Sequence, residues 1–205
     1  MKIGILGGSF DPIHYGHLHM AKCAYEAYAL DQVWLIPAGH SPNKDEEKMT
    51  AADDRYEMCL LASMPYPWLS VCRIELDSAE RSYTYRTMEK LTKQYPQHEF
   101  FFIMGGDSLD YFEKWRHPEL IARLSTILVI PRDQFTIEPL QKKIYELKKC
   151  FPCEIHLVKC ERFLVSSTEI RDSLKKNEMP EQVLPEAVVT YIRNHHLYQK
   201  QNMEQ

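Results

Sequence analysis

Short apolar runs alternate along the chain with longer segments whose apolar residues recur every third or fourth position. The runs contain few polar side chains and end near Gly, Pro or Asp, which is typical of strands buried on both faces. We expect strands at residues 2–6, 33–37, 69–76, 99–105, 125–131 and 154–158. Between them, helical spacing predicts helices at 16–29, 53–63, 83–94, 107–112 and 138–149, and further helices from 167 onward.

This alternation predicts the fold class. Strands that are apolar throughout and separated by helices indicate a parallel sheet with helices on both faces, so we expect a doubly wound α/β domain. Such sheets bind ligands at the carboxyl ends of their strands, near the point where strand order reverses. We expect one domain over residues 1–198, followed by a polar tail at 199–205.

Composition narrows the class of protein. The 205 residues are 44% hydrophobic and 26% charged, which is ordinary for a globular domain. With 25 basic and 29 acidic residues, the formal charge is −4, which disfavours a nucleic-acid duplex as partner but leaves small anions open. The apolar run at the N-terminus is too short for a signal peptide, and no stretch approaches the roughly 18 apolar residues of a membrane span. We therefore expect a cytoplasmic protein without membrane contact.

The cysteines are expected to be reduced thiols, because no export signal precedes them. They stand at Cys23, Cys59, Cys72, Cys150, Cys153 and Cys160. The last three and His156 are close enough in sequence to suggest zinc. However, the stretch from Cys153 to His156 runs into strand-like sequence, whereas structural zinc sites favour ligands on loops. We assign no metal ligands from the sequence, and metal analysis would decide whether this region is a zinc-dependent interaction module.

The first candidate site follows the first expected strand. Residues 7–18 read GGSFDPIHYGHL, and the paired glycines let backbone approach a ligand closely. His14 and His17 are three residues apart at a helix start, where free N–H groups and two imidazoles can bind phosphate. A chance pair at an ordinary helix start is one alternative. A His-x-x-His metal pair is another, although no third ligand is evident nearby.

The second candidate site lies near the C-terminus, where residues 165–171 read VSSTEIR. Ser166 or Ser167 can cap a helix, and Arg171 lies one turn further along. Hydroxyls, free N–H groups and a guanidinium together can hold a phosphate chain. The alternative is an ordinary capped helix.

Both strings resemble signatures of the nucleotidyltransferase superfamily, GxFxPxHxGH and ISSTxIR, in the same order along the chain. The resemblance implies a Rossmann-like nucleotidyltransferase fold in which the first signature contacts ATP phosphates and the second binds the β- and γ-phosphates. His14, His17 and Arg171 are then the expected catalytic residues. The resemblance implies ATP contacts from Gly7, Gly8, Ser9, Phe10, His14, His17, Lys44, Gly105, Asp107, Arg132, Ser166, Ser167, Thr168 and Arg171.

The sequence between the signatures is similar to the bacterial nicotinate-nucleotide adenylyltransferases. The matching stretches are residues 82–84, 102–109 and 114–115, and the likeness continues to about Tyr198. It implies that ATP and nicotinate mononucleotide give nicotinate adenine dinucleotide and pyrophosphate, a step of NAD biosynthesis. The mononucleotide would contact Ser82, Tyr83, Thr84 and Trp115.

Individual side chains suit these roles. Trp115 offers a flat face to a pyridine ring, Thr84 can bond its carboxylate, and Asp107 can accept hydrogen bonds from ribose hydroxyls. Packing in the core and helix capping are the alternative roles for Trp115 and Asp107.

Two loops depart from the family pattern. Residues 37–44 resemble its PxxxPPHK segment, but Asn43 replaces a histidine while Lys44 is retained. Arg132 matches the arginine of an RPG segment whose Pro-Gly is replaced by Asp133 and Gln134.

The mechanism expected is direct in-line transfer, because the mononucleotide phosphate is already an anion. Mg²⁺ should accompany ATP, held by phosphate oxygens and water, since the sequence shows no carboxylate cage. A transferase with another acceptor, such as nicotinamide mononucleotide or phosphopantetheine, and a non-catalytic nucleotide-binding regulator remain alternatives. A homo-oligomer is also possible.

Overall fold

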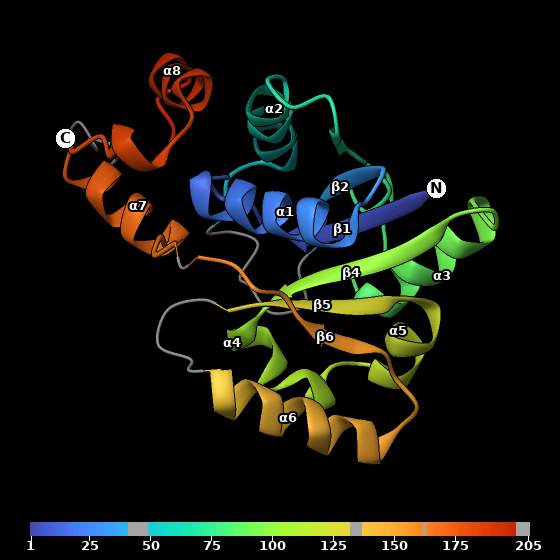
Figure 1. The fold of residues 1–205 in the computed structure, drawn as a ribbon. Coiled ribbons are helices and arrows are strands. Elements are labelled where there is room, and N and C mark those ends of the chain that lie inside the picture. Colours follow the sequence, from blue (N-terminus) through green and yellow to red (C-terminus); the bar gives the residue numbers. More distant parts are fainter. Residues whose placement is uncertain (41–48, 132–136, 162, 200–205) are drawn as a thin grey trace.

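The structure, a computed structural model, describes residues 1–40, 49–131, 137–161 and 163–199. Its centre is a six-stranded parallel sheet in the order β3-β2-β1-β4-β5-β6 (Figure 1). The strands are β1 (Lys2–Gly8), β2 (Gln32–Pro37), β3 (Leu69–Val71), β4 (Glu99–Gly105), β5 (Thr126–Ile130) and β6 (Ile155–Leu157). The doubly wound α/β fold expected from the sequence is confirmed.

Helices cover both faces of this sheet (Figure 1). On one face pack α1 (Tyr15–Tyr28), α2 (Ala52–Ser63), α7 (Ser167–Lys175) and α8 (Glu186–Asn194). On the other pack α3 (Thr84–Gln94), α4 (Gly106–Leu109), α5 (Pro118–Leu124) and α6 (Ile137–Cys150). The short 3₁₀ helices η2 (Phe112–Lys114) and η3 (Glu181–Val183) complete the described elements.

Strand β4 shows why these runs are apolar throughout. Phe101 and Ile103 enter the core beneath α1, whereas Phe100, Phe102 and Met104 enter the core on the opposite face. All five side chains are buried. Successive side chains of a strand point to opposite faces, so a strand covered on both sides needs apolar residues at every position. Each burial contributes about 1.5–3 kcal/mol relative to exposure.

The chain reverses its direction of winding at β1. Ile3 pairs with Gln32 of β2 on one side and with Phe100 of β4 on the other. The connections leading into β2 and into β4 therefore part at the carboxyl end of β1, where parallel sheets open a crevice for ligands. The first signature begins at that end.

Several predicted boundaries were wrong. The strand predicted at 69–76 ends at Val71, because β3 is an edge strand and the chain then turns, with Asp77 N–H donating to Arg73 O at 2.9 Å. Helix α2 begins at Ala52, one residue before the predicted start at Asp53, and its N-cap is Ala51. Helix α5 was not predicted, although Pro118 stands at its first position, where proline is favoured.

The cysteines also differ from the prediction. Cys23 on α1 and Cys160 after β6 form a disulfide, whereas Cys59, Cys72, Cys150 and Cys153 are free thiols. Folding brings the Cα atoms of the bonded pair to 5.9 Å across 137 residues of sequence, which is within bridging range. Sequence spacing alone could not reveal this proximity.

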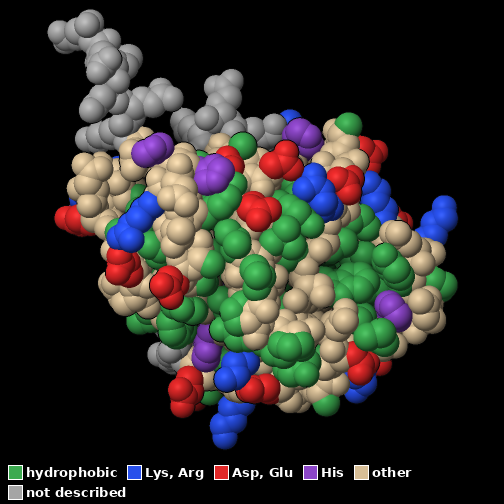
Figure 2. Space-filling view, turned by 90° about the horizontal axis from the view of Figure 1, so that it is seen from above, with side chains coloured by type: hydrophobic (Ala, Val, Ile, Leu, Met, Phe, Trp, Pro, Cys, Tyr) green, Lys and Arg blue, Asp and Glu red, His purple; other side chains and the backbone are tan. Residues whose placement is uncertain are grey.

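The outer face above α2 and α8 carries charges of both signs among exposed hydrophobic side chains (Figure 2). On this face no broad basic stripe of the kind that binds nucleic acid is visible. None of the helices in the described ranges is long and apolar enough to cross a bilayer.

Candidate active site

The loop after β1 turns sharply as it leaves the sheet. Gly8 O accepts a hydrogen bond from Ala38 N–H at 2.9 Å, which joins this loop to the end of β2. Phe10 then takes a left-handed backbone conformation with φ of 48°, which is uncommon for a bulky side chain. A Cβ added at Gly7 would meet nothing within 4 Å, because it would project into the open space where a ligand can approach.

The two signature histidines lie against each other at the start of α1. The His14 and His17 rings stack with centroids 3.8 Å apart, and the Phe10 and His17 rings are nearly perpendicular with centroids 5.0 Å apart. His14 is buried and its backbone N–H donates to Nδ1 of His17 at 3.3 Å. Because Nδ1 of His17 accepts this bond, the proton of the neutral ring sits on Nε2, which is then a donor for a phosphate oxygen.

The second signature closes onto the first. Ser166 caps α7 by accepting from Thr168 N–H at 3.2 Å, as the sequence predicted for this position. Ser167 Oγ donates to Pro12 O at 3.2 Å, and Arg171 Nη1 donates to Asp11 O at 2.7 Å. Helix α7, which carries Ser167 and Arg171, is therefore in direct contact with the loop that begins at Gly7 and Gly8, the glycine turn.

Arg55 of α2 secures the first loop from behind. It is buried, and its guanidinium donates to the main-chain oxygens of Thr50, Ser9 and Ala38 at 3.0, 2.8 and 2.8 Å. Burial lowers its pKa, an effect that the nearby Asp11 carboxylate opposes. Since arginine keeps its charge even with a reduced pKa, three backbone oxygens gain charge-assisted hydrogen bonds.

A cavity of about 630 Å³ opens beside the glycine turn. Its wall contains four residues that the sequence assigned to the mononucleotide, Ser82, Tyr83, Thr84 and Trp115, together with Gly7, Gly8 and Ser9. It also contains residues that the sequence did not assign, among them Glu75, Tyr111 and Arg116. The volume suits a ligand of mononucleotide size.

Charge is unevenly placed around this cavity. The guanidiniums of Arg116 and Arg81 hold the pKa of Tyr83 below its usual value, and Arg116 Cζ lies 5.0 Å from the Tyr83 ring centroid. Lys114 adds a second cation to the wall. Glu75 accepts from Thr87 Oγ1 at 2.6 Å, and burial raises its pKa. The cationic side of the cavity therefore favours an anionic ligand.

The remaining predicted residues lie at the edge of this arrangement or outside the described chain. Gly105 is the N-cap of α4, and Asp107 is exposed in its first turn, at the carboxyl end of the strand beside β1. Among the described residues, the wall of the cavity does not include the two histidines or Arg171, which adjoin it through the shared loop. Lys44 and Arg132 lie outside the described residues.

Comparison with known proteins places this geometry in a family. A family model described as cytidylyltransferase-like matches residues 5–173. A Bacillus cytotoxicus protein named "Probable nicotinate-nucleotide adenylyltransferase" is 37% identical over 97% of this chain and 98% of its own length. A protein of the same name from Lachnoclostridium phytofermentans is 36% identical over 96% of this chain and 98% of its own length. The chain belongs to the nicotinate-nucleotide adenylyltransferase family. The enzyme class expected from the two signatures is confirmed.

Solved structures support the fold of this adenylyltransferase. The Plasmodium falciparum nicotinic acid mononucleotide adenylyltransferase complexed with APC has a TM-score of 0.76 at 22% identity, over 96% of each chain. The same protein complexed with NaAD has a TM-score of 0.77 at 23% identity, over 96% of this chain and 97% of that chain. At such identities the likeness establishes the arrangement of the sheet and helices.

Three contacts of this adenylyltransferase escaped sequence reasoning. Tyr198 Oη donates to Asp11 Oδ1 at 2.7 Å, so the C-terminal segment also braces the first loop. Arg116 directly follows Trp115, and its charge beside the predicted ring platform is a signal that could have been read. Arg55 could have been suspected as a charged residue among the apolar residues Met58 and Ala62 of its helix.

Proposed function

We propose that this chain transfers AMP from ATP to nicotinate mononucleotide at the junction of the two signatures, releasing pyrophosphate. The observation that carries the proposal is the hydrogen bond from Arg171 to Asp11 O, which joins the two phosphate-binding segments beside the cavity. The names of the relatives and the ligand names of the Plasmodium structures support the choice of substrates.

The triphosphate is assigned to the signature side. His17 Nε2 and His14 would hold the α- and β-phosphates, while Arg171 and the start of α7 would hold the departing β- and γ-phosphates. The positive end of each helix adds to this field. The remaining ATP contacts are assigned to Gly7, Gly8, Ser9, Phe10, Lys44, Gly105, Asp107, Arg132, Ser166, Ser167 and Thr168.

The mononucleotide is assigned to the cavity. Its pyridine ring would lie against Trp115, and its carboxylate would contact Ser82, Tyr83 and Thr84. Arg116 and Lys114 offer positive charge to a ligand that carries both a carboxylate and a phosphate. Their positions support nicotinate, whose ring carries a carboxylate, over nicotinamide, whose ring carries an uncharged amide.

The transfer needs no general base. An oxygen of the mononucleotide phosphate attacks the α-phosphorus, and the bond from that phosphorus to the oxygen bridging the β-phosphate breaks. The side chains bind and orient the two substrates in line and stabilise charge on the leaving pyrophosphate. Mg²⁺ belongs to the substrate complex with ATP, where phosphate oxygens and water are its preferred ligands. Among the described residues, no cluster of carboxylate side chains lies at the signatures to hold the ion.

The test is to measure pyrophosphate release with ATP and either pyridine mononucleotide. We expect release with nicotinate mononucleotide and at least about tenfold lower kcat/KM with nicotinamide mononucleotide. The latter lacks the ring carboxylate with which Arg116 and Lys114 can pair. Tight ATP binding without pyrophosphate release would instead indicate a nucleotide-binding regulator. A single domain over 1–198, a cytoplasmic location and a possible homo-oligomer stay predictions.

A further inference from the structure

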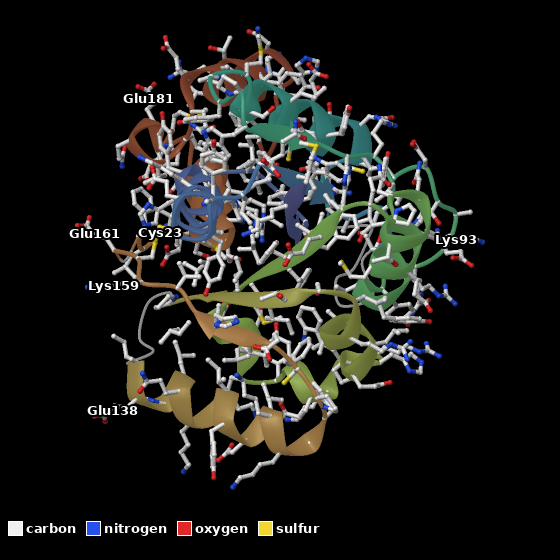
Figure 3. All side chains as sticks on the ribbon, turned by 45° about the vertical axis from the view of Figure 1, so that its right-hand side comes forward. Cys23, Lys93, Glu138, Lys159, Glu161 and Glu181 are labelled. Atoms are coloured by element: carbon white, nitrogen blue, oxygen red, sulfur yellow. A yellow bond between two sulfur atoms is a disulfide. The ribbon has the colours of Figure 1, made fainter. Side chains whose placement is uncertain are left out.

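His19, Cys23 and Cys160 form a cluster outside the nucleotide site. His19 and Cys23 are four residues apart on α1 and so share one face of that helix. Cys160 reaches them from the segment between β6 and α7. Figure 3 shows Cys23 on α1 beside the segment that carries Lys159 and Glu161, whose side chains point outward.

The three side chains converge on one point. His19 Nε2 lies 3.1 Å from Cys160 Sγ and 3.6 Å from Cys23 Sγ, and the three ligand atoms all lie within 4.8 Å of one another. Within the described part of the chain, this is the one group of three or more His, Cys, Asp or Glu side chains that meets this spacing. Of the residues suspected from the sequence, Cys160 belongs to it, whereas Cys150, Cys153 and His156 do not.

A disulfide alone does not account for the histidine. A Cys₂His set is a donor set that zinc prefers, with Zn–S near about 2.3 Å and Zn–N near about 2.0–2.1 Å. Tetrahedral ligands at those lengths place nitrogen and sulfur about 3.6 Å apart. The His19–Cys23 separation of 3.6 Å matches this value, and the His19–Cys160 separation of 3.1 Å would have to widen by about 0.5 Å. All three side chains are half-buried and border an open hollow of about 450 Å³, which leaves a fourth position accessible to water.

We propose that His19, Cys23 and Cys160 bind one zinc ion when the two cysteines are reduced. The disulfide and the zinc complex are then two alternative states of the same three side chains. Binding requires His19 Nε2 to give up its 2.6 Å hydrogen bond with Glu161 O, so that its lone pair can face the metal. It also requires the two sulfurs to separate to about 3.8 Å around the ion.

The two states interconvert by a balanced redox step. Two cellular monothiols, or one dithiol, reduce the Cys23–Cys160 bond: they supply two electrons and two protons to the two sulfurs and are themselves joined as a disulfide. Zinc then binds both sulfurs as thiolates, two protons pass to solvent, and His19 binds through a neutral nitrogen. Oxidation reverses these steps and releases the metal.

The position of the cluster gives it a structural role. Its α1 ligands follow closely after His17, and its third ligand precedes the Ser166 cap of α7 by a few residues. A zinc ion here would tie together the two segments that carry the phosphate-binding signatures. The site would thus stabilise their relative position without touching the nucleotide.

The experiment is metal analysis of the full-length protein, purified with a dithiol reductant and without chelator, then titrated with Zn²⁺ against a chromophoric chelator. We expect about one zinc per chain, and release of that zinc when the protein is oxidised to the disulfide. Cys23→Ser and Cys160→Ser should abolish tight binding. The matched controls Cys150→Ser and Cys153→Ser should retain it, since neither residue lies in the cluster.

His19→Ala keeps both thiols, so it tests the site even if the cysteine variants fail to fold. We expect it to weaken zinc affinity by at least about tenfold, since even outer-shell changes cost about 10–100-fold. Co²⁺ bound to the wild type should show thiolate-to-metal charge-transfer absorption that Cys23→Ser lacks. Reduced wild-type protein that binds no more zinc than Cys23→Ser would overturn the proposal, as would loss of binding in Cys150→Ser. These readouts are independent of the nucleotidyl transfer proposed above.

Discussion

Arg171 Nη1 on α7 donates a hydrogen bond to the main-chain oxygen of Asp11, 2.7 Å away, across 160 positions of sequence. Its Nη2 lies 3.3 Å from Thr168 Oγ1 in the same helix. One guanidinium therefore links the loop after β1 to the start of α7, the two segments assigned to the triphosphate. Its planar fork lets it hold this backbone oxygen and still offer donors to a ligand.

Arg171→Lys tests that linkage. Lysine keeps the charge but offers a single flexible ammonium, so we expect kcat/KM for ATP to fall by about tenfold or more while KM for nicotinate mononucleotide changes little. Steady-state kinetics with each substrate varied in turn measures both values. Arg193→Lys is the control, because the exposed Arg193 side chain pairs with Glu181 at the surface. An equal rise in KM for both substrates would place Arg171 elsewhere in the mechanism.

His17→Ala removes the donor proposed to face the α-phosphate. Loss of one preorganised donor costs about 2.7–4 kcal/mol of barrier, so we expect kcat to fall by about 10²–10³. Pyrophosphate release under saturating substrates measures it. His156→Ala removes a histidine that lies at the surface, 3.5 Å from Glu154, and should leave kcat unchanged. A turnover rate for His17→Ala near that of the control would remove His17 from catalysis.

Local sequence pattern predicts those features that depend on neighbours along the chain. The apolar run at 99–105 became a strand with the same bounds, and Ser166, one of the two serines expected as a cap, caps α7. Arg55 and Tyr198 brace the first loop through contacts with residues far away in sequence, which no local pattern encodes. The Cys23–Cys160 bond was missed for the same reason. The expectation that cysteines stay reduced in the absence of an export signal does not consider which two sulfurs the fold brings together.

Arg55→Met tests the bracing of the glycine turn. The variant leaves three backbone oxygens without their donor, and hydrogen bonds to a charged group are worth about 1.5–3 kcal/mol each. Because the oxygens can relax toward water, we expect the free energy of unfolding to fall by about 3 kcal/mol overall. Urea denaturation measures the loss. Arg73→Met is the control, since Arg73 pairs with Asp53 and Asp77 at the surface and its loss should change the urea midpoint little.

Arg116→Ala tests the charge of the cavity. Removing a cation beside the proposed carboxylate site should raise KM for nicotinate mononucleotide by about tenfold, with KM for ATP unchanged, because Arg116 lies on the cavity wall away from the signature helices. The variant should also reduce the preference for nicotinate over nicotinamide mononucleotide. Arg123→Ala, in the last turn of α5 and outside the cavity wall, serves as the control. An unchanged preference would show that Arg116 does not read the carboxylate.

Glu75→Gln tests a pH dependence built into the same cavity. Burial raises the pKa of Glu75 in the folded protein above its unfolded value of about 4.3. Between these two pKa values the folded state binds more protons than the unfolded state, so this group's contribution to stability falls as pH rises through that window. Glutamine cannot ionise, yet its carbonyl oxygen can still accept from Thr87 Oγ1. We therefore expect the variant to gain stability relative to the wild type as pH increases from about 4 to 7.

Urea midpoints across that range measure the difference, and Glu89→Gln, an exposed position on α3, is the control. A difference that is constant with pH would mean that Glu75 titrates alike in both states.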